Sequence, residues 1–297
     1  MRFICFAVAA TWASACSPVS EPFESRGEFV LSPEAALARL SDATLLDVRA
    51  ESDFTAGHVR GATRVDWRDF SEPNDPLKGR LLADDRVLGF LLSRAGVSND
   101  RPVLVVGDPI NGWGEDGRIV WMLRSLGHEV AALVDGGHGA LAAAGAPTEL
   151  GVNSAREGSF VVSRTAAFTI ELEELARLVS SPGQTVILDG REAREYAGET
   201  PYGEARGGHV PGAKHLYFRD LTDARGRILP KDALWARLGS VGVSSASPVV
   251  AYCTGGVRSG WMVAVLGELG VASVRNFAGS MWEWAARPAT EYPLVRE

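Results

Sequence analysis

Cys253 is the residue whose surroundings best suit a nucleophile. It follows the apolar run 249–252 and precedes a glycine-containing loop and a helical pattern. Loop N–H groups and the positive end of a helix stabilise an anion, and Arg258 adds a fixed positive charge. The pattern therefore predicts a thiol whose pKa is below its ordinary value of about 8.5, and hence a reactive thiolate.

The residues after this cysteine are predicted to bind the anion that forms on it. The alternative is a buried structural cysteine, since a free cysteine most often packs as a small apolar side chain. Two glycines and an arginine are poor choices for a packed apolar site, which favours the reactive thiol. The predicted anion-binding residues are Thr254, Gly255, Gly256, Val257, Arg258 and Ser259.

The composition is that of an ordinary folded protein. Among 297 residues, 46% are hydrophobic and 23% are charged, which excludes wholesale disorder, a collagen-like chain and a multi-span membrane protein. The net charge of −7 gives no reason to expect a nucleic-acid partner. Cys5, Cys16 and Cys253 form no Cys-x-x-Cys or Cys/His cluster, so neither a disulfide framework nor a metal site is expected.

The chain contains an internal repeat. At roughly 150 residues per domain its length predicts two domains, and ordered matches between the halves support this number. The first copy is predicted at 27–145, a linker at 146–158 and the second copy at 159–297. The matching segments are 46–49 with 188–191, 57–62 with 208–213, 68–70 with 219–221, and 96–98 with 242–244.

Each copy is predicted to be a small α/β unit, with a parallel sheet flanked by helices. Short apolar runs bounded by glycine or proline fit buried parallel strands. A helix after the last such run in each copy places a functional loop at the carboxyl end of a strand. The predicted strands are 44–48, 103–106, 185–188 and 249–252, and the predicted helices are 33–40, 119–126, 170–179 and 260–269.

The two copies differ where the chemistry is expected. Gly107 stands in the first copy at the place of Cys253, and the first copy contains no cysteine. The second copy is therefore the predicted catalytic unit and the first copy an inactive one. Because the first copy keeps the scaffold residues Asp47, Arg49 and His58, we expect it to close over the Cys253 loop and to wall the active site.

These segments together resemble the tandem-domain rhodanese family, which comprises the thiosulfate and 3-mercaptopyruvate sulfurtransferases. Both halves carry its Asp-x-Arg motif, and the second half carries its Cys-x-x-Gly-x-(Thr/Arg)-(Ala/Ser) loop. Residues 208–213 match its Gly-His-(Ile/Val)-Pro-Gly-Ala signature fully, and residues 57–62 depart from it only at Arg60. The resemblance covers nearly all of residues 27–297 and implies two rhodanese-like domains. The matching segments are 47–49 and 189–191, 57–62 and 208–213, 253–259 for the loop and 279–284 for the family's closing segment.

The resemblance implies a two-step sulfur transfer. The Cys253 thiolate is expected to take the outer sulfur of a donor as a persulfide, and a thiol or cyanide then accepts that sulfur. No metal or organic cofactor is implied, and the partners are small molecules, the donor and the acceptor. In the family, enzymes acting on thiosulfate commonly carry basic residues in this loop, and those acting on 3-mercaptopyruvate carry glycine and a hydroxyl residue. Thr254 and Gly255 are not basic, but Arg258 lies at the far end of the loop, so the loop leaves the donor open between the two.

Two arginines are candidates for binding the donor. The resemblance implies that Arg191, in the Asp-x-Arg motif, faces the site, where its planar guanidinium could bind an anion through two hydrogen bonds. Arg206 lies in the insertion 197–207, before His209, and is the second candidate. The alternative for both is an internal salt bridge.

Two other functional classes stay open. The rhodanese fold also hosts cysteine phosphatases, whose Cys-x5-Arg loop wraps a phosphate. Here only four residues separate Cys253 from Arg258, so the loop is one residue short. A non-catalytic module that binds sulfur or a partner protein is the other class, and the intact cysteine loop counts against it. A gain of one sulfur on Cys253 after incubation with thiosulfate would favour the transferase.

The N-terminus is predicted to be a targeting segment. A short positive region, an apolar run and the small residues 13–15 are typical of a secretory signal, and the run is too short to span a bilayer. Cys16 directly follows, as the lipidated cysteine does in bacterial lipoproteins. Residues 1–26 are therefore predicted to be signal peptide and tether, and the protein to be exported, periplasmic or anchored to a bacterial membrane only through lipid on Cys16.

Overall fold

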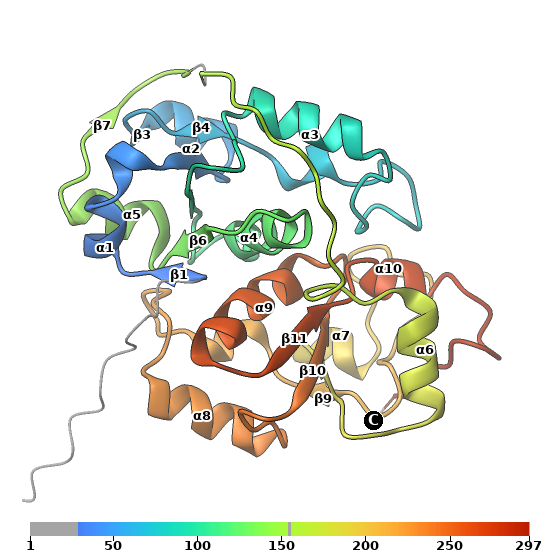
Figure 1. Ribbon diagram of the computed structural model, residues 1–297. Helices are drawn as coiled ribbons and strands as arrows, with labels where there is room; N and C mark the ends of the chain where they lie inside the picture. The colour runs from blue at the N-terminus through green and yellow to red at the C-terminus, as the bar shows by residue number, and fades with distance from the viewer. Residues whose placement is uncertain (1–28, 154–155, 297) are drawn as a thin grey trace, which may run out of the picture.

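Two α/β units are stacked on one another in the computed structural model, which describes residues 29–153 and 156–296. The first unit, blue to green, lies above the second, yellow to red, in Figure 1. The predicted signal peptide and Cys16 lie outside the described residues. Within the described ranges, every helix is too short or too polar to cross a bilayer.

The first unit is built on a five-stranded sheet in which all neighbouring strands are parallel. Buried Val, Leu and Ala side chains fill its strands because helices cover both faces of such a sheet. The strand order is β1 (Val30–Leu31), β6 (Ala131–Val134), β5 (Val103–Val106), β2 (Thr44–Asp47) and β4 (Thr63–Arg64).

Five α-helices and two 3-10 turns belong to the first unit. Ser32 caps the first helix, with its hydroxyl accepting the N–H of Ala35 at 3.2 Å. The helices are α1 (Pro33–Leu37), α2 (Glu51–Ala56), α3 (Asp85–Arg94), α4 (Glu115–Ser125) and α5 (Gly137–Ala143), and the turns are η1 (Leu40–Asp42) and η2 (Trp67–Phe70).

The second unit repeats this plan with four parallel strands. The strand order is β11 (Ser273–Asn276), β10 (Pro248–Tyr252), β8 (Val186–Asp189) and β9 (Lys214–His215). Its helices are α6 (Leu172–Ser180), α7 (Ala193–Ala197), α8 (Lys231–Ser240), α9 (Val257–Leu269) and α10 (Ser280–Trp284), with the turn η3 (Phe218–Leu221). The predicted fold class, two α/β units with parallel sheets, is confirmed.

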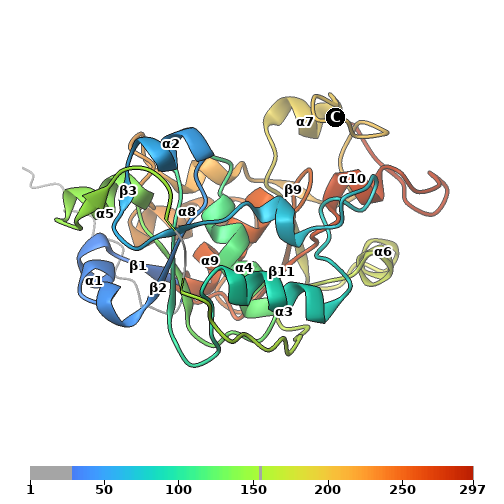
Figure 2. The ribbon, with the colours of Figure 1, turned by 90° about the horizontal axis from the view of Figure 1, so that it is seen from above.

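Helices α4 and α9 pack against each other where the two units meet (Figures 1 and 2). Glycines permit the close approach, because a Cβ on Gly117 would lie 2.3 Å from the Trp261 Cα. One hydrophobic cluster runs through both units and includes Met122 of α4 and Val263 of α9. The two units therefore share a core, which fixes the position of one unit relative to the other.

The segment between the units is tied to the first of them. Within the predicted linker, β7 (Thr148–Glu149) pairs antiparallel with β3 (His58–Val59). At the end of the linker, the N–H of Gly158 donates to the Ser93 carbonyl at 2.8 Å, and beyond it the N–H of Ser163 donates to the Leu126 carbonyl at 2.9 Å. The chain thus follows the first unit before it enters the second sheet.

The predicted strands are confirmed, but two helices begin earlier than predicted. The helices expected at 119–126 and 260–269 start at Glu115 and Val257. In both cases a glycine with positive φ, Gly114 at 84° and Gly256 at 78°, precedes the first turn. The hydrophobic pattern misses that turn because its side chains serve the domain interface and the cysteine loop. Arg258 consequently lies within α9 itself.

Candidate active site

Cys253 lies between the end of β10 and the start of α9, and its side chain is buried, with 1% exposure. Its backbone N–H donates to the Ser280 hydroxyl at 3.0 Å, and that hydroxyl donates to the Phe277 carbonyl at 2.7 Å. Ser280 adopts a φ of 50°, in the left-handed region that a serine seldom occupies. The start of α10 thus fixes the backbone that carries the thiol.

The thiol lies in a field that favours its anion. Burial by itself raises the pKa of Cys253, but the charge of Arg258 and hydrogen bonds from Ser259 and the Gly255 N–H outweigh it. The Ser259 hydroxyl donates to the sulfur at 3.5 Å. The net effect is a pKa below the ordinary thiol value. A greater fraction of the thiol is consequently ionised at neutral pH.

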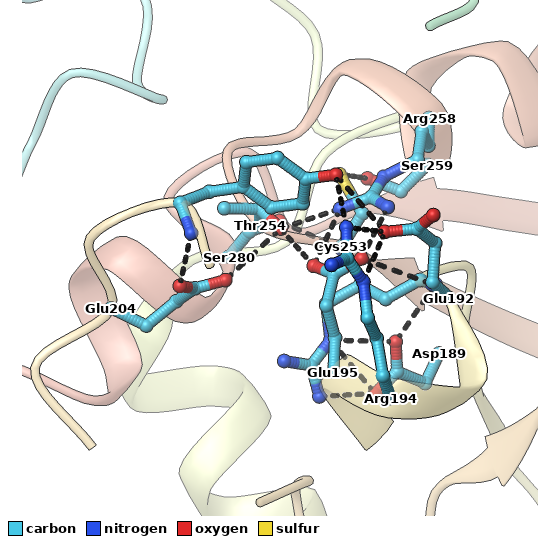
Figure 3. A network of polar contacts seen from close by, with 12 residues as sticks. Asp189, Glu192, Arg194, Glu195, Glu204, Cys253, Thr254, Arg258, Ser259 and Ser280 are labelled. Carbon is cyan, nitrogen blue, oxygen red and sulfur yellow. Dashed lines mark hydrogen bonds and ion pairs between the residues drawn. The ribbon is translucent and has the colours of Figure 1, made fainter. Parts of the chain in front are cut away.

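Arg258 reaches the loop from the first turn of α9, and Glu195 of α7 binds it (Figure 3). Arg258 Nη1 lies 2.7 Å from Glu195 Oε2, and Nη2 lies 2.8 Å from Oε1. The Thr254 hydroxyl donates to Glu195 Oε1 at 2.6 Å and accepts a hydrogen bond from Arg258. This closed network holds the loop in one conformation.

A cavity of about 160 Å³ opens onto Cys253, and both units line it. Trp113 of the first unit meets Tyr202 of the second edge-on, with ring centroids 5.7 Å apart. The other residues that line the cavity are Trp67, Arg68, Glu115, Thr254, Gly255, Val257, Arg258 and Trp282. The prediction that the first copy closes over the Cys253 loop is confirmed.

The prediction that Arg191 faces the donor is wrong. The side chain is fully buried; its Nε and Nη2 bind the Asp189 carboxylate, and Nη2 also donates to the Gly208 carbonyl at 2.8 Å. In the first unit Arg49 binds Asp47 in the same way. Because the arrangement recurs in the unit that has no thiol, its role is to join β2 and β8 to the turns beside them.

Arg206 is likewise absent from the cavity that exposes Cys253. Its guanidinium donates to the carbonyls of Ala285, at 2.8 Å, and Tyr292, at 2.9 Å. Further bonds go to the carbonyls of Trp284 and Arg287. The expectation that Arg206 binds the donor is therefore corrected: it ties the C-terminal segment to the insertion.

The sequence did not reveal three residues around the loop. Glu195 contacts Arg258 across 63 positions, and Ser280 contacts Cys253 across 27. Arg118 reaches the Gly256 carbonyl from the first unit, across 138 positions. No local spacing signals such long-range contacts. The spacing typical of an ion pair within one helix does not reveal them either, because each of the three contacts joins two different elements.

Comparison with known proteins places the chain in a family. The description "Rhodanese-like domain" matches residues 32–144 and again residues 171–287. The chain therefore belongs to the rhodanese-like family and has one such domain in each half. From here the two units are called the first and second domains.

Several relatives over most of the length are named sulfurtransferases. A thiosulfate sulfurtransferase of Corynebacterium glutamicum is 31% identical, over 89% of this chain and 91% of its own. A probable 3-mercaptopyruvate sulfurtransferase of Pseudomonas aeruginosa is also 31% identical, over 87% of this chain and 95% of its own. The fold matches the crystal structure of SseA from Escherichia coli, which is described as a 3-mercaptopyruvate sulfotransferase, with a TM-score of 0.72 at 22% identity, covering 86% of this chain and 99% of that one.

Proposed function

We propose that this sulfurtransferase works through a persulfide on Cys253. The supporting observation is that Cys253, with its lowered thiol pKa, opens into a cavity that both domains line. A nucleophile of this kind needs to be anionic and accessible to a small donor. The cavity at Cys253 and the lowered thiol pKa meet these two requirements.

In the first step the Cys253 thiolate attacks the outer sulfur of the donor. With thiosulfate, a new S–S bond forms on Cys253, the donor's S–S bond breaks, and its electron pair leaves with sulfite. With 3-mercaptopyruvate, the C–S bond breaks, and its electron pair and the thiol proton leave as pyruvate. N–H groups at Gly255 and Ser259 that bind the thiolate are placed to stabilise the persulfide anion.

In the second step an acceptor takes the outer persulfide sulfur. Cyanide attacks that sulfur, the persulfide S–S bond breaks, and the Cys253 thiolate returns with the electron pair. A thiolate acceptor leaves as a persulfide by the same exchange. Only small molecules fit beside Cys253, because the cavity measures about 160 Å³.

The donor's negative charge is met by Arg68 of the first domain. Two arginines, Arg68 and Arg258, line the cavity. The Arg258 charge is balanced by Glu195, at 2.7 Å. Among the residues that the structure describes, Arg68 forms an ion pair only with Asp66, at 3.1 Å, and its side chain is 68% exposed. It is therefore the lining cation that can exchange its partner for an anionic donor.

The persulfide is tested by mass spectrometry. The protein is incubated with thiosulfate or 3-mercaptopyruvate and digested without reductant, and the Cys253 peptide is weighed. We expect a gain of one sulfur, removed by cyanide with release of thiocyanate. The variant Cys253→Ser, treated in the same way, serves as the control. A Cys253 peptide without added sulfur after both donors would contradict the proposal, and the two rates measured side by side identify the preferred donor.

We also propose that the protein is exported, and that Cys16 carries a lipid. The support is the sequence alone, with its short apolar run followed by small residues and Cys16. Fractionation of bacterial cells that express the full chain tests this. We expect wild type in the membrane fraction and Cys16→Ser in the periplasmic or cytoplasmic fraction. Wild-type protein confined to the cytoplasm would contradict export.

A further inference from the structure

Arg118 connects the first domain to the loop that carries the nucleophile. It lies in α4 and is 1% exposed. Its Nη1 donates to the Gly256 carbonyl at 3.3 Å, and its Nη2 donates to the Gly79 carbonyl at 2.7 Å and the Ser71 hydroxyl at 3.2 Å. All three acceptors are neutral. A charge from the domain without a thiol is thus buried beside the cysteine loop of the other domain.

Arg118 differs from the other buried arginines of the site in having no carboxylate. Arg191 binds Asp189 at 2.7 Å, and Arg258 binds Glu195 at 2.7 Å. Within residues 29–153 and 156–296, no carboxylate lies within 4 Å of the Arg118 guanidinium. A buried cation without an anion nearby is costly. The Arg118 charge therefore calls for an anion from another chemical group.

The negative charge that acts on Arg118 is that of Cys253. Burial lowers the pKa of Arg118 to about 9, and the negative charge of Cys253 opposes this effect. The other charged groups around the thiol are Arg258, which favours its anion, and Glu195, which balances Arg258. Arg118 thus supplies a positive charge that no carboxylate has already compensated.

We propose that Arg118, supplied by the domain without the nucleophile, is a second countercharge, in addition to Arg258, that helps to keep Cys253 and its persulfide anionic. It acts as a positioning residue, because it contacts the Gly256 carbonyl rather than the sulfur. The proposal deepens the proposed function, since it concerns the same nucleophile. It also gives the first domain an electrostatic role in addition to walling the cavity.

A comparison of the two loops at the domain interface supports this assignment. Each loop meets a side chain of the other domain's helix, α4 or α9. Gly114 precedes α4 as Gly256 precedes α9, both with positive φ. A Cβ on Gly256 would lie 2.7 Å from Arg118 Nη1, whereas a Cβ on Gly114 would lie 2.8 Å from Trp261 Cβ. At these two glycines the loop without a thiol meets an uncharged ring, and the loop with the thiol meets a guanidinium that is 1% exposed. Arg219 of the second domain also reaches the loop without a thiol, at the carbonyls of Pro109 and Gly112, but its side chain is only partly buried.

The test is the pH dependence of Cys253 alkylation by iodoacetamide, followed on the Cys253 peptide by mass spectrometry. Arg118→Gln removes the charge and keeps hydrogen-bond donors, while Arg118→Lys keeps the charge. Arg118→Met is a second uncharged variant, whose side chain still packs on the Trp121 ring that the guanidinium covers at 4.5 Å. Arg86→Gln is the control, on an arginine whose side chain is 93% exposed.

We expect the alkylation midpoint of either uncharged variant that folds to rise by about one pH unit. Arg118→Lys should stay closer to wild type, and Arg86→Gln should coincide with it. A midpoint unchanged in a folded uncharged variant would overturn the proposal, since a purely structural role lowers the melting temperature without moving the midpoint. Alkylation requires no sulfur donor, so this result is independent of whether Cys253 transfers sulfur.

Discussion

Arg258 and Glu195 form a buried, two-pronged ion pair beside the nucleophile, with nitrogen–oxygen distances of 2.7 and 2.8 Å. Glu195 has no exposed surface, and the pair joins α7 to the first turn of α9. The carboxylate limits the field that Arg258 exerts on Cys253 and fixes the guanidinium in place. The thiol pKa thus depends on two domains: on Arg258 balanced by Glu195, and on Arg118 from the other side.

Replacing Glu195 by glutamine should lower the thiol pKa and destabilise the fold together. Removing the negative charge leaves Arg258 uncompensated, which further favours the Cys253 thiolate. Breaking a buried ion pair should cost about 3 kcal/mol of unfolding free energy. Alkylation profiles and denaturant unfolding measure the two effects, with the exposed Glu199→Gln as the control. A higher alkylation midpoint in Glu195→Gln would contradict this electrostatic account.

Arg68 and Arg191 should separate donor binding from folding. Arg68→Gln removes the exposed cation of the cavity, so we expect KM for thiosulfate to rise about tenfold with little change in kcat. Arg191→Gln breaks the buried pair with Asp189 and should lower the melting temperature, while KM of the folded fraction stays near wild type. The reverse assignment of the two KM effects would restore Arg191 as the donor-binding residue.

Alanine substitutions at two glycines test how closely side chains pack on the cysteine loop: Gly255 is tightly surrounded, and Gly239 has open space around it. A Cβ on Gly255 would lie 2.1 Å from Trp282 Cζ3, whereas a Cβ on Gly239 would meet nothing within 4 Å. We expect Gly255→Ala to displace Trp282, to cost about 1–3 kcal/mol of stability and to lower kcat/KM at least tenfold. Gly239→Ala in α8 should be neutral or stabilise by about 0.5 kcal/mol. Equal effects of the two changes would refute the close packing on the loop.

Stability should depend on pH through Cys253. The folded-state pKa of this thiol lies below its ordinary value. Between the two values the unfolded chain binds more protons, so the thiolate stabilises the fold increasingly as pH rises, and this stabilisation is lost as pH falls through the folded pKa. The melting-temperature difference between wild type and Cys253→Ala should grow from acidic pH toward about pH 9. A difference that is constant over this range would contradict the lowered pKa.

The sequence predicted the elements of the site better than its contacts. The repeat and the Cys253 loop could be recognised because they are local patterns, and Ser32 at a helix start is a local signal too. The role of Arg191 could not be recognised in the same way, because its Asp-x-Arg motif is identical whether the guanidinium faces a donor or a neighbouring carboxylate. Arg118 was equally hidden, because its relation to Cys253 exists only after the two domains pack through α4 and α9.

The central claim, that Cys253 carries the sulfur, is tested most directly by the turnover of Cys253→Ser. Thiocyanate formation from thiosulfate and cyanide is measured for wild type and variant, with circular dichroism to show that both are folded. A hydroxyl is far less acidic and nucleophilic than a thiol and forms no persulfide. We predict loss of turnover by at least a factor of about a thousand. Turnover near the wild-type rate in the folded variant would contradict the assignment.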